Sequence, residues 1–124
     1  MGRVLRYVSQ EKKTVNLDGQ KYLSGVNCGA EVAQQSFMAT KNLYSKASGT
    51  FFYHYVQSFS PQEPISFAEA HQIALELAER FFPGCEVLVA THVDAEHPHS
   101  HFVVNSVHPD TGKSSTSRPK PWSR

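Results

Sequence analysis

The chain has few cysteines, no long apolar run and almost no net charge, and each shortage narrows the classes of protein it can belong to. Its 124 residues include two cysteines, Cys28 and Cys85, without C-x-x-C spacing, which argues against a disulfide framework or a zinc knuckle. No stretch is long enough to span a membrane and no signal peptide opens the chain, so we expect a cytoplasmic protein without membrane insertion. The formal net charge of +1 neither requires nor excludes a nucleic-acid partner.

The length and the 40% hydrophobic content allow one domain with a real core. Apolar periodicity and turn residues predict a helix end at 3–8, a strand at 21–28, a helix at 30–46, a strand at 50–59, a helix from 66 to about 82, and two strands at 87–92 and 99–104. This order predicts an α+β fold, a mostly antiparallel sheet with helices packed on one face. We assign 1–112 to this domain and expect 113–124, rich in Ser, Pro, Lys and Arg, to be disordered.

The start of the predicted helix at 66 carries a capping box. The Ser66 hydroxyl is placed to accept from a backbone N–H of the first turn, and Glu69 is placed to reach back to the N-cap. Pro83 and Gly84 end the helix. Its predicted core face holds five apolar residues: Phe67, Ala70, Ala74, Leu77 and Phe81.

The most informative feature present is a cluster of histidines. Four of the seven histidines fall within ten residues: His92, His97, His99 and His101. Imidazole is the commonest protein ligand for divalent transition metals. Alternate strand residues share a face, so His99 and His101 should stand side by side. His92 closes the preceding strand, and an antiparallel neighbour can supply a third ligand. The pattern therefore favours a metal site.

These residues also resemble a known family. The segments His92-Val-Asp94, His99-Ser-His101 and Val103-Val-Asn105 resemble the metal motif of relaxases, the mobilization nucleases of the HUH endonuclease superfamily, in particular the MobP-type group. Leu5-Arg-Tyr7-Val-Ser-Gln-Glu-Lys-Lys-Thr14 is similar to the nucleophile segment of the family. Ser24-Gly-Val-Asn-Cys28 and His54-Tyr-Val-Gln-Ser-Phe59 are similar to the segments that follow it. The likeness runs from about residue 3 to about residue 112.

The resemblance implies a ferredoxin-like, HUH relaxase-like sheet and an enzyme that nicks single-stranded DNA at a plasmid or transposon transfer origin. It implies that Tyr7 is the nucleophile and that His92, His99 and His101 hold a divalent metal, Mg²⁺ or Mn²⁺, with Zn²⁺ as an alternative. Asp94 and His97 would orient an imidazole or handle a proton. The implied partners are the DNA of the transfer origin and accessory mobilization proteins. Asn105 fits a hydrogen-bonding role at a strand end rather than a catalytic one.

The chain also departs from the family pattern. Ser100 stands where a hydrophobic residue usually separates two histidines, and we expect its side chain to point away from the metal. In another register His97 would replace one of the assigned ligands. Five residues precede Tyr7 after the initiator Met, and 113–124 is unpatterned, so we expect an incomplete member of the family. Two alternatives remain: a catalytically inactive relaxase fragment, or a histidine-ligated zinc hydrolase.

Overall fold

The computed structural model describes residues 2–15, 20–44, 52–59, 64–93 and 98–112. The predicted tail, 113–124, lies outside these ranges. In chain order the elements are α1 (Gly2–Val8), α2 (Glu11–Thr14), β1 (Leu23–Val26), η1 (Ala30–Val32), α3 (Ala33–Leu43), β2 (Phe52–Ser58), α4 (Phe67–Phe81), β3 (Val87–His92) and β4 (His99–Asn105).

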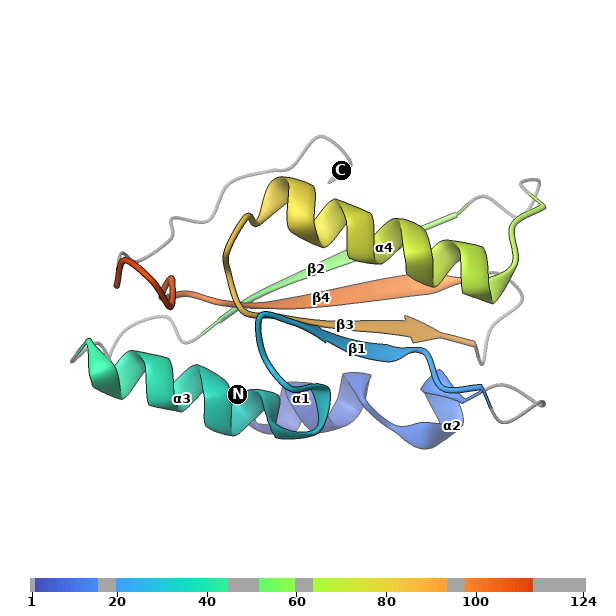
Figure 1. Cartoon of the computed structure of the whole chain (residues 1–124). Coiled ribbons are helices and arrows are strands. Elements are labelled where there is room, and N and C mark those ends of the chain that lie inside the picture. The colour runs from blue at the N-terminus through green and yellow to red at the C-terminus, as the bar shows by residue number, and fades with distance from the viewer. Residues whose placement is uncertain (1, 16–19, 45–51, 60–63, 94–97, 113–124) are drawn as a thin grey trace.

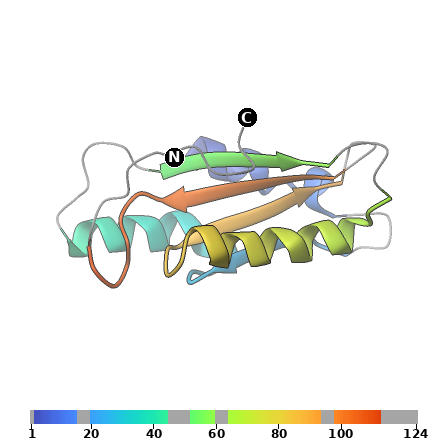
Figure 2. The same ribbon diagram turned by 90° about the horizontal axis from the view of Figure 1, so that it is seen from above.

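The four strands form one sheet in the order β1-β3-β4-β2, and every neighbouring pair is antiparallel. Figure 2 shows the four strands side by side in this order. The two strands that carry the histidine cluster, β3 and β4, are the central ones. The predicted α+β class and antiparallel sheet are confirmed.

The helices differ from the prediction in one respect, because they cover both faces of the sheet. Figure 1 shows α4 on one side and α1, α2 and α3 on the other. Each face of the sheet has its own core. Successive residues of β3 and β4 point alternately into the two cores, and these residues are apolar. They are Val87, Val89, Phe102 and Val104 on the α4 side, and Leu88, Ala90 and Val103 on the α1 and α3 side. A central strand that is apolar on both faces requires helices on both.

The capping box of α4 is present as predicted. The backbone N–H of Glu69 donates to Ser66 Oγ at 3.1 Å, and the backbone N–H of Ser66 donates to Glu69 Oε1 at 3.1 Å. The buried side is centred on small residues, Ala70, Ala74 and Ala78, together with His71. Leu77 and Phe81 are only partly buried at the border of this core. Small residues at the centre let the helix approach the sheet closely.

Gly25 in β1 is needed because the backbone folds back against it. A Cβ atom built at this position would lie 2.1 Å from the carbonyl oxygen of Cys28. The strand predicted at 21–28 is present, although β1 itself is shorter. The segment between α1 and β1, for which no element was predicted, contains the short helix α2. The first turn of the helix predicted from residue 30 is the 3-10 helix η1.

A buried polar network ties α3 to the sheet at the end of β4 distant from the histidines. The fully buried Lys41 donates from Nζ to Asn105 Oδ1 at 2.5 Å and to Ser106 Oγ at 2.7 Å. The Asn105 amide donates to Glu86 Oε1 at 2.8 Å, and the Thr40 hydroxyl donates to the same oxygen at 2.6 Å. Asn105 thus has buried structural partners.

Neither cysteine forms a disulfide in the described part of the chain. Burial, with a smaller effect from the Glu86 charge, raises the pKa of the Cys28 thiol to about 11, which keeps it protonated and unreactive at neutral pH. None of the described helices has the length and apolar character that crossing a membrane requires.

Candidate active site

The histidines of β3 and β4 meet where the two strands end and begin. His92 is the last residue of β3 and lies directly opposite His99, the first residue of β4. His101 follows two residues later, so it shares a face with His99. The ring centroids of His92 and His101 are 4.1 Å apart. The three histidines assigned from the sequence therefore lie on the same face of neighbouring strands, the face that α1 covers.

A fourth histidine joins them from the outer strand β2. His54 Nε2 lies 2.8 Å from His101 Nδ1, which is a hydrogen bond between two imidazoles. Their ring centroids are 5.1 Å apart. His101 is buried between its neighbours, whereas His54 is exposed. We call His54, His92, His99 and His101 the histidine group.

Tyr7 projects from α1 toward the same place. Its ring lies edge-on to two imidazoles, with its centroid 6.0 Å from that of His92 and 6.5 Å from that of His101. The neighbours Leu5 and Val8 are buried and anchor the helix, while Tyr7 remains 48% exposed. A reactant approaching from solvent could therefore reach the phenol, which lies directly beside the buried rings of His92 and His101.

The end of α1 is held directly by one of these histidines. His92 Nε2 lies 3.0 Å from the carbonyl oxygen of Val8, the residue after Tyr7. A carbonyl oxygen only accepts, so Nε2 carries the proton in this arrangement and Nδ1 keeps the lone pair. The position of Tyr7 is therefore coupled to the orientation of the His92 ring.

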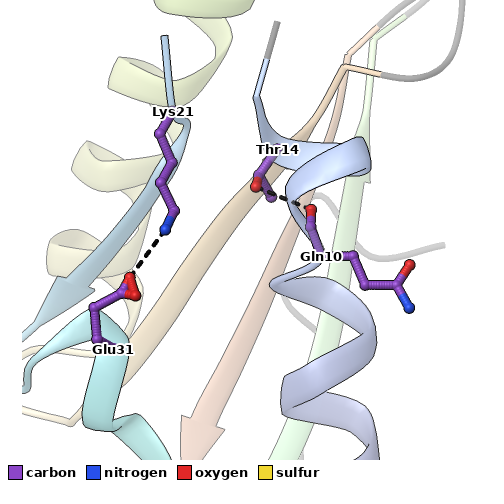
Figure 3. Close-up of polar contacts among 4 residues, drawn as sticks. All are labelled: Gln10, Thr14, Lys21 and Glu31. Carbon is purple, nitrogen blue, oxygen red and sulfur yellow. Dashed lines mark hydrogen bonds and ion pairs between the residues drawn. The ribbon is translucent and has the colours of Figure 1, made fainter. Parts of the chain in front are cut away.

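The segment after α1 brings a cation to the site. Lys13 Nζ lies 5.1 Å from the centre of the Tyr7 ring. The backbone carbonyl of Lys13 accepts from the N–H of Val93, which fixes α2 against the end of β3. Figure 3 shows how α2 is closed locally, with the buried Thr14 hydroxyl donating to the carbonyl of Gln10 at 3.0 Å.

Burial lowers the pKa of two members of the histidine group, His101 and His54. Desolvation, followed by the charges of His92 and His54, lowers the pKa of His101 from 6.5 to about 3. Desolvation, followed by the charge of His92, also lowers the pKa of His54. Neutral imidazoles keep a ring lone pair, which is the form that binds a metal ion.

A second polar chain lies behind the histidine group, on the α4 side of the sheet. His71 Nδ1 lies 2.9 Å from Thr91 Oγ1, and His71 Nε2 lies 2.8 Å from Ser24 Oγ. Thr91 Oγ1 also lies 3.0 Å from Ser100 Oγ. Ser100 therefore points away from His99 and His101, as expected, and its hydroxyl links β4 to β3.

Two residues expected to assist catalysis, Asp94 and His97, lie outside the described residues. Across the ranges that the structure describes, no set of three or more His, Cys, Asp or Glu side chains is arranged to hold a metal ion. The donor chemistry of the histidine group nevertheless suits a divalent metal, because its members supply closely spaced imidazole nitrogens, and the lowered pKa of His101 keeps that ring neutral. His92, His99 and His101 are the residues that could hold it.

A cavity of about 270 Å³ lies beside α1, and Tyr7 is not among the residues that line it. Lys21, just before β1, and Glu31, in η1, belong to its lining and form an ion pair of 3.0 Å, seen in Figure 3. Its lining mixes polar and apolar side chains: Leu5, Arg6, Ser9, Lys21, Leu23, Ala30, Glu31, Ala33, Gln34, Gln35 and Leu88.

The sequence analysis did not single out three of the polar side chains around the histidine group: His54, Lys13 and His71. His54 stands in a predicted strand, but only the pairing of β2 with β4 places it diagonally beside His101. His71 sits within a helix among apolar residues, where burial cannot be read from residue type. The contacts of His54 and His71 join segments distant in sequence, and the contact of Lys13 with Tyr7 depends on how α2 packs beside α1, so local patterns carry no signal for them.

Comparison with known proteins decides the family. The family model of the MobA/VirD2-like relaxase nuclease domain matches residues 7–123, nearly the whole chain. The chain belongs to this relaxase family. No solved structure matches it.

Curated relatives of this relaxase domain carry relaxase names. A protein named rlx from Staphylococcus aureus is 41% identical over 97 residues, which cover 78% of this chain and 30% of that protein. The group II intron-interrupted relaxase LtrB of Lactococcus lactis subsp. cremoris is 30% identical over an alignment that covers 86% of this chain and 23% of that protein. The chain thus spans less than a third of the length of the relatives it matches.

Proposed function

We propose that this relaxase domain nicks one strand of DNA by transesterification, with Tyr7 as the nucleophile. The Tyr7 ring lies beside His92 and His101, although these residues are far apart in the sequence. This placement supports the proposal, because it brings the candidate nucleophile next to the candidate metal ligands. The family match supports the reaction class. The exposure of Tyr7 leaves its phenol accessible to a phosphodiester.

The proposed step exchanges one phosphate ester for another. Tyr7 Oη attacks the scissile phosphorus, a tyrosine–phosphorus bond forms with the 5′ end, and the bond to the 3′ oxygen breaks. The phenol proton leaves to a base, a role that suits Asp94 or His97, and the departing 3′ oxygen takes up a proton. The ester energy is conserved in the phosphotyrosine, so the strand can later be rejoined.

In this proposal His92, His99 and His101 hold a divalent metal, Mg²⁺ or Mn²⁺, with Zn²⁺ as the alternative. When bound, the ion supplies Lewis-acid stabilisation of a phosphoryl oxygen and orients the phosphate for in-line attack. The neutral state of buried His101 supports its role as a ligand. Lys13, close to the Tyr7 ring, adds positive charge on the side where a phosphate would approach.

The proposed substrate is single-stranded DNA at the transfer origin of a plasmid or conjugative transposon, processed in the cytoplasm with accessory mobilization proteins. The names of the relatives support this assignment. The chain spans about 30% of the rlx protein, so the activity of a whole relaxase is a proposal for this chain. An inactive fragment that keeps the fold but does not cleave is the competing proposal.

The test is formation of a covalent protein–DNA adduct. The chain is incubated with Mn²⁺ and end-labelled single-stranded DNA carrying the transfer origin, and the products are separated on a denaturing gel. We expect a slow-migrating labelled adduct that disappears in Tyr7→Phe. Tyr55→Phe is the matched control, because the Tyr55 ring stacks on Phe82 on the opposite face of the sheet.

Two results would contradict the proposal. An adduct that persists in Tyr7→Phe would assign the nucleophile to another residue. No adduct or nick with any divalent metal, from a chain shown to be folded, would favour the inactive fragment.

A further inference from the structure

We infer that His54 is a positioning residue that orients His101 and fixes its tautomer, so that His101 presents the Nε2 lone pair to the bound ion. The inference rests on the proposed function, because it assumes that His101 is a metal ligand. No site residue was predicted on β2. Through His54, this strand would contribute directly to the site.

The contact is specific in its atoms. His54 Nε2 and His101 Nδ1 are 2.8 Å apart, and the two rings are tilted by 34° with centroids 5.1 Å apart. Their backbones are held by the β2–β4 ladder, in which His54 pairs with Val103 and Val56 pairs with His101. His54 therefore lies diagonally across from His101 on the same sheet face, and this register sets their separation.

The hydrogen bond limits what each ring can do. One nitrogen of the pair must donate and the other must accept, so a single proton lies between them. If His101 Nδ1–H donates to His54 Nε2, the lone pair of His101 is on Nε2, where it can bind a metal. If His54 donates instead, His101 carries its own proton on Nε2 and cannot ligate through that atom. Only the first arrangement agrees with the proposed role of His101.

An acceptor behind a ligating imidazole is a general feature of metal sites. It orients the ring, selects the tautomer and raises the basicity of the ligating nitrogen. A carboxylate or a backbone carbonyl usually plays this part. Here an imidazole occupies that place, and its neutral form accepts as well. His54 also lies on an outer strand and is exposed, so replacing it removes no buried packing.

The experiment compares the full chain with His54→Phe, which keeps a ring but cannot accept, and with His54→Glu, which restores an acceptor. Val56→Thr is the control for substitution on this face of β2, because Val56 pairs with His101 in the ladder and its apolar side chain makes no hydrogen bond to it. Circular dichroism establishes that each variant is folded. Long-range ¹H–¹⁵N NMR of the histidine rings then reports the His101 tautomer without metal, and calorimetry with Mn²⁺ reports affinity.

We expect His101 to carry its proton on Nδ1 in the parent and in Val56→Thr, and to lose this preference in His54→Phe. Mn²⁺ affinity should fall about 10- to 100-fold in His54→Phe, the usual cost of losing such a partner, and recover in His54→Glu. An Nε2–H tautomer in the metal-free parent would overturn the inference. So would unchanged Mn²⁺ affinity in folded His54→Phe, or direct coordination of Mn²⁺ by His54.

The two proposals fail separately. If the parent binds Mn²⁺ but forms no DNA adduct, the nicking proposal fails while the positioning role of His54 stands on the tautomer and the affinity. If adducts form normally but the tautomer of His101 does not depend on His54, the positioning role alone is wrong.

Discussion

At the scale of single residues, His92 and His101 each use one ring nitrogen in a hydrogen bond within the fold, which leaves the other nitrogen for the site. His92 uses Nε2 to hold the carbonyl of Val8 at the end of α1, and His101 uses Nδ1 to bond His54. In each ring one nitrogen is committed to the fold, which determines where the other points. Local hydrogen bonds therefore decide which nitrogen is directed toward a reactant.

Replacing the candidate ligands one at a time tests their roles. We expect His92→Ala, His99→Ala and His101→Ala each to reduce Mn²⁺-dependent adduct formation to background, because a three-ligand site loses its ion when one ligand is removed. His108→Ala is the control, since His108 lies at the opposite end of β4 near Pro83. The measurement is the initial rate of adduct formation at several Mn²⁺ concentrations. A variant with the parental rate would remove that histidine from the ligand set.

A second residue-scale prediction concerns His71 and pH. Burial lowers the pKa of His71 below its usual value of about 6.5. As pH falls through 6.5 the unfolded chain takes up a proton that the folded chain does not, so the free energy of unfolding decreases on acidification. We expect His71→Gln, which retains hydrogen-bonding groups for Ser24 and Thr91, to lose less stability between pH 7 and pH 5 than the parent. Urea unfolding at both pH values measures it, and equal losses would contradict it.

At the scale of elements, the long helix α4 fixes one face of the sheet through a start signal that is local in sequence. The capping box defines where the helix begins, and its buried alanines bring it against β3 and β4. On the other face, α1 is short and depends on Leu5, Val8 and the His92 contact for its position. The helix that carries the candidate nucleophile is thus held by tertiary contacts.

The N-cap of α4 gives an element-scale prediction. Ser66→Ala removes the acceptor of the Glu69 N–H, and we expect it to lower the free energy of unfolding by about 1 kcal/mol. Ser66→Thr keeps a hydroxyl and should recover most of this loss. Chemical denaturation followed by circular dichroism measures the difference. Equal stability of Ser66→Ala and the parent would show that the cap contributes nothing.

At the scale of the whole molecule, two polar networks and two apolar cores join layers made from distant parts of the chain. The network around Asn105 connects α3 to β4, and the chain through His71 and Thr91 connects α4 to β3. Each lies beside a core whose apolar packing encloses it. Buried polar groups that are fully paired specify one arrangement of layers, since any other leaves them unpaired.

Lys41 gives a prediction at this scale. Burial lowers the pKa of its ammonium from 10.5 to about 8, so between pH 8 and 10.5 the unfolded chain holds more protons than the folded chain. The titration of Lys41 by itself should therefore raise the free energy of unfolding with pH across this window. Lys41→Met removes this titration, and it also removes the ammonium that donates to Asn105 and Ser106. We therefore expect the substitution to lower the free energy of unfolding by about 1–3 kcal/mol at pH 7.

The comparison must be made between parent and variant at each pH. The raised pKa of Cys28 acts in the opposite direction above pH 9, but it is common to both proteins. The difference in stability between parent and Lys41→Met should therefore widen from pH 8 to pH 10. A difference that stays constant would mean that folding does not lower the pKa of Lys41.

The sequence alone determined the features that arise from neighbouring residues. The alternation of His99 and His101, the capping box at Ser66 and the apolar runs of β3 and β4 depend on the geometry of one helix or one strand, so they could be predicted. The motifs around Tyr7 and His92 were also sufficient to suggest the family that the comparisons show.

Only the tertiary structure decided which side chains from separate elements meet. The contact of His54 with His101, the bond from His92 to the end of α1 and the position of Lys13 over Tyr7 each require a strand register or a helix placement. The helices cover both faces because the central strands are apolar on both. Register and layer order follow from the packing of the whole chain, and this is why local sequence patterns did not reveal them.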